Sequence, residues 1–240
     1  MTLTADRAVL TAREAGDALA LAEAYRMASS GYRRTGRYDR AVQTAVRAAD
    51  QLAADRTAPR AARASHGGNL LATAAYTAAK HGNRAGAREL IRAAHRTAEA
   101  LGGERCAGSA WFGPRQVALH EVSVHQVLGD PEAAVKAARA LPVRGLPRER
   151  AARLCIDVAR AYEDWGRPEE CYRALLSAER AVPEEVRRES IRELTRKLLP
   201  YERRLPGIRD LARRTAAVAE TNPDRYSVTK GAYPTGTSLT

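Results

Sequence analysis

Polar side chains recur at helical spacing in four stretches of the chain, each of which ends shortly before a glycine. Residues three or four apart share one face of a helix. We therefore expect one polar groove lined by Glu23, Arg26, Ser30, Asn69, Thr73, Tyr76, Gln116, His120, Ser123, Arg153, Asp157 and Arg160. This mixture of cations, carboxylates, amides and hydroxyls suits binding of peptide backbone, carboxylates or a polar small molecule. The alternative is an ordinary wet groove without a ligand.

Histidine is the groove residue with the widest chemical range. His120 shares a face with Gln116 and Ser123, so it is either a hydrogen-bonding anchor and pH-sensitive contact or a structural residue that ties the preceding loop to its helix. The scattered His66 and His95 are expected at the surface.

The stretch "WFGPR" carries the chain's only phenylalanine and one of its two tryptophans. Aromatic residues just before a helix commonly pack against its first turn. Trp111 and Phe112 are therefore expected to fill the gap between two helical units. The alternative is a lid over the groove, formed by Trp111, Phe112 and Arg115.

Sequence motifs for catalysis and metal binding are missing. The chain has no glycine-rich phosphate loop, no HExxH and no G-x-S-x-G. Cys106, Cys155 and Cys171 form an odd set without CxxC spacing, so reduced, mostly buried thiols are expected. We predict no catalytic residue, no metal site and no cofactor.

The composition indicates an all-α protein. Hydrophobic residues make up 45% of the 240 positions but aromatic residues only 5%, because alanine dominates, and alanine has the highest helix propensity. The net charge of +12 comes almost entirely from arginine. Either the arginines pair with acids on solvated helix faces, or they form a nucleic-acid surface.

The ends of the chain favour a protein of the cytoplasm. The charged N-terminal stretch does not resemble a signal peptide, and no segment is apolar enough to cross a membrane. The N-terminal helix exposes apolar side chains, which indicates either a fragment of a longer protein or a homo-oligomer formed through that helix.

The positions that must hold the groove together recur in register. When the chain is aligned on Gly36, Gly82, Gly129 and Gly166, small residues stand five positions later at Ala41, Ala87, Ala134 and Cys171. A glycine turn followed by a tightly packed helix is the tetratricopeptide pattern, although the spacings of 46, 47 and 37 residues exceed the usual period of about 34. The prediction is an all-α, right-handed tetratricopeptide-like solenoid of about five helix pairs with degenerate repeats.

Helix signals predict the individual elements and the domain limits. A helical repeat domain is expected over 1–220 and a disordered tail over 221–240. The predicted helices span 4–15, 18–35, 38–56, 66–81, 83–101, 114–128, 131–141, 148–165, 167–181, 184–199 and 203–219.

The stretches "AWFGPRQVALHEVSVHQVLGDPEAA" and "ERAARLCIDVARAYEDWGRPEECYRALLSAERAVPEEVR" give a family resemblance. They resemble the C-terminal tetratricopeptide region of actinobacterial transcriptional regulators that carry an XRE-type helix-turn-helix domain. The likeness covers roughly residues 5–215, and the sequence shows no helix-turn-helix signature. The resemblance implies a regulatory module that binds a protein, a peptide or a small effector, with only an indirect link to nucleic acid. The alternatives are direct nucleic-acid binding and an obligate assembly subunit.

Overall fold

The computed structural model describes residues 2–107 and 110–217, and its regular structure is almost entirely helical. The all-α prediction is confirmed. The α-helices are α1 (Thr2–Glu14), α2 (Ala18–Arg34), α3 (Tyr38–Ala54), α4 (Arg60–Lys80), α5 (Arg84–Leu101), α6 (Pro114–Val127), α7 (Pro131–Ala140), α8 (Arg148–Asp164), α9 (Pro168–Ala181), α10 (Glu189–Leu198) and α11 (Ile208–Arg214).

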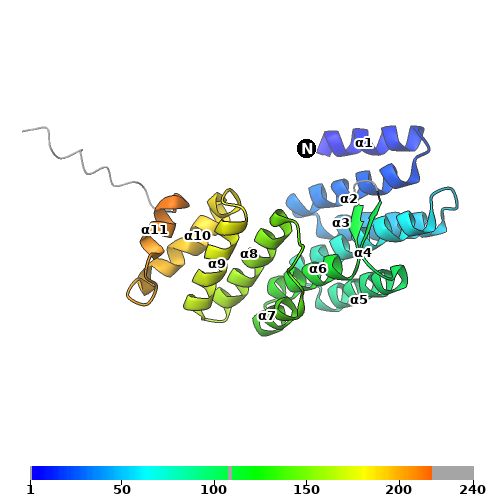
Figure 1. Cartoon of the computed structure of the whole chain (residues 1–240). Coiled ribbons are helices and arrows are strands. Elements are labelled where there is room, and N and C mark those ends of the chain that lie inside the picture. The colour runs from blue at the N-terminus through cyan, green and yellow to red at the C-terminus, as the bar shows by residue number, and fades with distance from the viewer. Residues whose placement is uncertain (1, 108–109, 218–240) are drawn as a thin grey trace, which may run out of the picture.

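The helices follow one another across an elongated molecule, with α1 at one end and α11 at the other (Figure 1). Each helix from α1 to α8 contacts the next helix along the chain. In addition, α2 contacts α4, α4 contacts α6, α6 contacts α8, and α8 contacts α10. The even-numbered helices therefore form a continuous row.

Four aligned glycines end α2, α4, α6 and α8. Gly36, Gly82, Gly129 and Gly166 all have φ between 70° and 80°, a left-handed conformation that glycine adopts without the Cβ penalty. After each glycine the next residue's N–H bonds back to the preceding helix, as Arg37 N does to the Tyr32 carbonyl at 2.9 Å. The sharp reversal packs the following helix against the one before.

The small residues predicted behind each turn lie at the helix contacts. Ala41, Ala87, Ala134 and Cys171 are each 0% exposed. Because alanine adds so little bulk, the backbones approach closely, and much of the core is alanine. Ser29, also 0% exposed, donates from Oγ to the Ala41 carbonyl at 2.9 Å and so links α2 to α3.

The bounds of three helices, α4, α10 and α11, differ from the prediction by five or more residues at one end or both. Helix α4 begins at Arg60 rather than 66, directly after Pro59, whose fixed φ and missing N–H suit a helix start. The predicted helices 184–199 and 203–219 are shorter and are flanked by 3-10 turns at Glu185–Arg187 and Leu199–Tyr201. Pro200 and Gly207, the latter with φ 87°, interrupt the helical run.

The connection before α6 contains two strands that the sequence did not predict. Strands β1 (Arg105–Ala107) and β2 (Ala110–Phe112) pair antiparallel, with Cys106 opposite Trp111. The His66 Nε2 lies 3.2 Å from the Ala107 carbonyl. His66 therefore helps to tie this segment to α4, and the prediction of a surface position for it was wrong, since it is 5% exposed.

Phe112 is part of the core and not of a lid. It is 0% exposed and packs among residues of α4, α5 and α6. Its ring lies directly over Gly68 of α4, where a Cβ would be 2.0 Å from Cζ. The lid prediction is therefore wrong for Phe112, because its side chain fills the space between units.

The predicted tail, 221–240, lies outside the described residues. The helices that the structure describes are all too short or too polar to cross a lipid bilayer. Helix α1 packs on α2, and its Leu10 remains 55% exposed.

Candidate functional site

Helices α2, α4, α6 and α8 line a polar cavity of about 590 Å³, which we call the cationic cavity. It is lined by Arg26, Ser30, Arg33, Thr73, Tyr76, Lys80, Gln116, Leu119, His120, Ser123, Glu149, Arg150, Arg153, Leu154, Asp157, Arg160, Glu185 and Arg188. Helices α2, α4, α6 and α8 supply most of these side chains, and the segment after α9 supplies the last two.

Of the twelve residues predicted to line a groove, all but Glu23 and Asn69 line this cavity. Glu23 pairs with Arg26 at 2.6 Å and so fixes a lining cation. Asn69 donates from Nδ2 to the Trp111 carbonyl at 3.2 Å, which holds the strand segment against α4. These two residues therefore act on the cavity indirectly, Glu23 by fixing Arg26 and Asn69 by holding the strand segment in place.

The lining extends one helical turn beyond three of the four predicted rows. Arg33 follows Ser30 by three residues, Lys80 follows Tyr76 by four, and Arg150 precedes Arg153 by three. The same 3.6-residue period that gave the predicted rows would have found all three. Glu185 lies in the short 3-10 turn after α9 and Arg188 directly follows it, and this turn is too short to show a periodic pattern in the sequence.

A chain of hydrogen bonds joins α8 to α6 in the cavity. The Arg150 guanidinium donates to Gln116 Oε1 at 2.8 Å, and Gln116 Nε2 lies 3.2 Å from His120 Nε2. This amide orientation makes His120 Nε2 the acceptor and leaves the imidazole neutral. Burial, together with the charges of Arg150 and other arginines, lowers the pKa of His120 to about 4. The His120 side chain therefore bonds to Gln116, another of the predicted groove residues, on the same helix.

Asp157 is the buried carboxyl group of the site. It is 6% exposed, accepts a hydrogen bond from Ser123 Oγ, and lies 3.6 Å from Arg160. Burial raises its pKa, and the contacts with Ser123, Arg153 and Arg160 oppose that shift. The carboxyl group is thus already engaged with neighbouring donors and does not dominate the charge of the cavity.

Positive charge exceeds negative charge in the lining, with seven cations against three carboxyl groups. Within the part of the chain that the structure describes, three of the cations form ion pairs: Arg26 with Glu23, Arg160 with Asp157, and Arg188 with Glu185. The others have no carboxylate in ion-pair range among those residues. We call these four the unpaired cations: Arg33, Lys80, Arg150 and Arg153.

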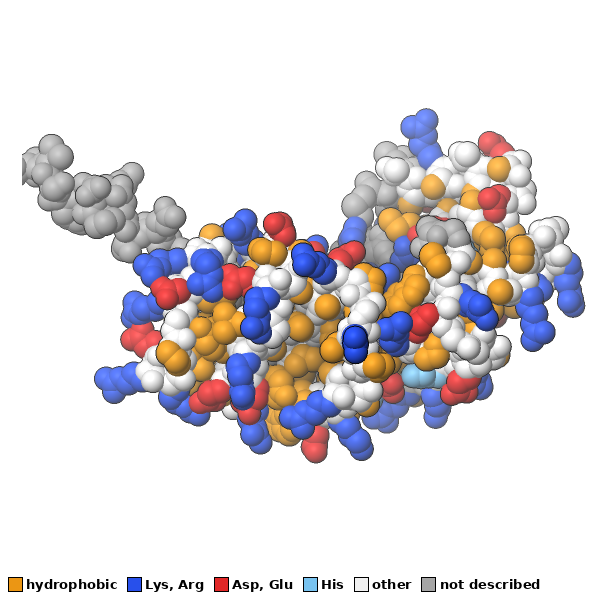
Figure 2. Space-filling model, viewed as in Figure 1, with side chains coloured by type: hydrophobic (Ala, Val, Ile, Leu, Met, Phe, Trp, Pro, Cys, Tyr) orange, Lys and Arg blue, Asp and Glu red, His pale blue; other side chains and the backbone are white. Residues whose placement is uncertain are grey.

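Elsewhere on the molecule, arginines stand among acidic residues. Figure 2 shows Lys and Arg spread over the visible face with Asp and Glu between them. Many pairs lie within one helix, such as Arg196 with Glu193 at 2.7 Å. Exposed pairs of this kind stabilise little, but they balance charge locally. The unpaired cations are therefore distinguished by lining one cavity together, and not by the absence of an ion pair alone.

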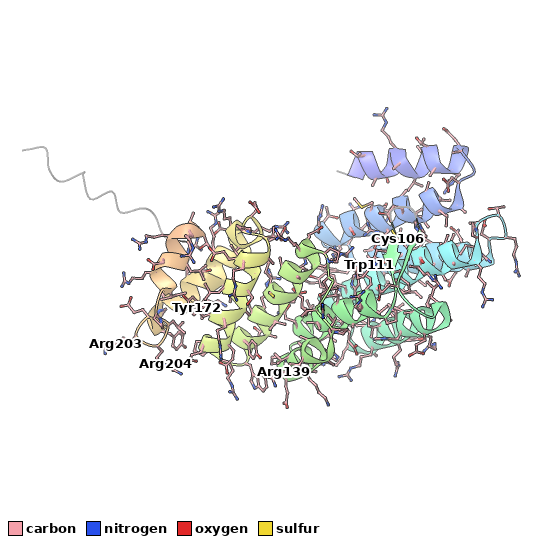
Figure 3. All side chains as sticks on the ribbon, in the orientation of Figure 1. Cys106, Trp111, Arg139, Tyr172, Arg203 and Arg204 are labelled. Atoms are coloured by element: carbon pink, nitrogen blue, oxygen red, sulfur yellow. The ribbon has the colours of Figure 1, made fainter. Side chains whose placement is uncertain are left out.

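The remaining candidate lid residues lie beside the cavity rather than in its lining. The Trp111 ring has the guanidinium carbon of Arg150 5.4 Å from its centroid. The Arg115 side chain donates to the Arg144 carbonyl at 3.1 Å, and its backbone N–H donates to Glu104 at 2.6 Å. Figure 3 shows Trp111 next to Cys106, in the strand segment. Trp111 thus supports a lining arginine from the side.

The described residues form neither a metal-binding cluster nor a site with an ionised buried thiol. No group of three or more His, Cys, Asp or Glu side chains there is placed to hold a metal ion. Burial raises the pKa of Cys171 to about 12 and also raises that of Cys155, so both thiols stay protonated at neutral pH.

No family model, curated protein or solved structure matches this chain.

Proposed function

We propose that the chain is a non-enzymatic binding module of a transcriptional regulator, built as a right-handed tetratricopeptide-like solenoid of about five helix pairs. Its ligand, a peptide, a protein segment or a small effector, occupies the cationic cavity. One observation carries this proposal: side chains from four helices far apart in the chain converge on a single polar cavity.

The convergence suggests how binding is transmitted. A ligand that contacts α2, α4, α6 and α8 at once favours the helix arrangement in which all four contacts are made. Because these helices lie in a row, a small change in each contact adds up along the molecule. The effect can be no larger than the difference in the ligand's affinity for the two arrangements.

The experiment compares the full chain with the variant Gln116→Ala/His120→Ala/Arg153→Ala. Both proteins are immobilised and screened with a random peptide display library and a panel of small polar metabolites. We expect ligands that bind the full chain and are lost on the triple variant, while the two proteins melt at similar temperatures. The same ligands bound by both proteins, or none bound by either, would refute the cavity as the binding site.

A further inference from the structure

We propose that the cationic cavity binds a compact, multiply charged anion of the phosphate and diphosphate ester class, held by the four unpaired cations. The inference rests on the proposed function, because it assigns a ligand chemistry to the same cavity. The contacts, charges and size of the site support it.

The cavity brings positive charges close together. Arg33 lies 5.1 Å from the Tyr76 ring centroid, and Lys80 lies 5.9 Å from it, so the two cations share one aromatic side chain of α4. Arg150 and Arg153 reach the same space from α8. Burial and the neighbouring Arg26 and Arg153 lower the pKa of both Arg33 and Arg150. These cations repel one another, and a bound anion would remove that repulsion.

The charge and the volume of the cavity also match this class of anion. A cavity of about 590 Å³ lies within the range of roughly 300–1,000 Å³ that is typical of small-molecule sites. A carboxylate carries one negative charge, whereas a phosphate monoester carries about 1.5 to 2 at neutral pH. Joined phosphoryl groups therefore balance four cations in less space than the same charge spread over a peptide.

The hydrogen-bond donors of the unpaired cations suit phosphoryl oxygens. Guanidinium groups offer parallel N–H bonds that match two oxygens of a phosphoryl group, and a lysine adds a compact positive charge. Gln116 is already held between Arg150 and His120, at 2.8 and 3.2 Å. Its position fixes the Arg150 side chain, so part of the ordering cost is met before a ligand arrives.

The experiment is a calorimetric titration of the full chain with inorganic pyrophosphate and inorganic triphosphate at about 0.05 M salt, where exposed charges are weakly screened. The test variant is Arg33→Gln/Arg150→Gln. The matched control is Arg92→Gln/Arg203→Gln, which removes the same charge from two exposed positions. Figure 3 shows Arg203 at the end of the molecule opposite Trp111. Citrate and random duplex DNA are titrated as alternative anions.

We expect one site for pyrophosphate or triphosphate, an affinity about 100-fold lower in the test variant, at about tenfold for each lost charged hydrogen bond, and little change in the control. Failure of both phosphates to bind, or equal weakening in both variants, would overturn the proposal. Citrate binding as tightly as triphosphate would also overturn the phosphate class. Binding of duplex DNA without binding of the phosphates would indicate a nucleic-acid surface instead.

The two proposals fail in different ways. If the phosphates do not bind but library peptides are still lost on the Gln116, His120 and Arg153 variant, only the phosphate class is wrong. If no ligand of any kind depends on these residues, the cavity is not the binding site, and both proposals fall.

Discussion

Two neighbouring glycines of α4 should respond in opposite directions to the same substitution. Gly68 lies under the Phe112 ring, and a Cβ there would be 2.0 Å from Cζ. Gly67 has no heavy atom within 4 Å of the equivalent position. Both glycines lie inside the same helix, so alanine improves the helix propensity equally at each position. The difference between the unfolding free energies of the two variants therefore measures the effect of the Phe112 ring.

Two effects set the expected changes in unfolding free energy, namely helix propensity and overpacking of the core. Replacing glycine by alanine in a helix interior stabilises by up to about 1 kcal/mol. Overpacking a filled core costs roughly 1–3 kcal/mol, and a fully buried ring in so close a contact belongs at the upper end. We expect Gly67→Ala to stabilise the protein by about 1 kcal/mol. Gly68→Ala should destabilise it by about 2 kcal/mol, the cost near 3 less the gain near 1.

The assay is urea unfolding followed by circular dichroism. Phe112→Ala alone should cost about 3–5 kcal/mol, because it removes a buried aromatic side chain. In that background the ring is gone, and Gly68→Ala should become stabilising, as Gly67→Ala is. Equal stabilities of Gly67→Ala and Gly68→Ala in the wild-type background would refute the packing of Phe112 on α4.

Three further predictions concern single side chains. Ser29→Ala should lower the unfolding free energy by about 1 kcal/mol, because the hydrogen bond that links α2 to the Ala41 carbonyl of α3 is lost, and urea unfolding measures this. Glu121 lies 3.9 Å from His125 Nε2 and 3.1 Å from His95 Nε2, and these two histidines lower its pKa to about 2. Its contribution to stability should be complete above about pH 4.5 and lost as the pH falls toward 2. Replacing Glu121 by glutamine should remove that acid dependence, and a wild-type-like dependence in the variant would contradict the assignment. His120, with a pKa of about 4, should remain neutral throughout an NMR titration from pH 7 to pH 5, and a midpoint near 6.5 would show that it is not buried among arginines.

Much of the helical architecture was predictable because it depends on local signals. Glycine turns and alanine-rich helices are short-range features, and most predicted boundaries lie within two residues of the observed ones. The groove residues were predictable for the same reason, since a period of 3.6 places Arg26 and Ser30, or Gln116 and His120, on one face of a helix. Arg33 and Lys80 were missed only because the predicted rows stopped one turn early.

The sequence by itself determined the helix order, the glycine turns and the face of each helix that carries polar residues. Only the tertiary structure decided that Phe112 packs on Gly68 of α4, because the two residues are about 40 positions apart. It also decided that β1 pairs with β2, because no local period marks that pairing. It also decided which arginines lack a carboxylate. Some pairs, such as Arg26 with Glu23, follow from a local spacing of three residues. Pairs between segments, such as Arg84 with Asp130, depend on which helices pack side by side, and the linear sequence does not contain that information.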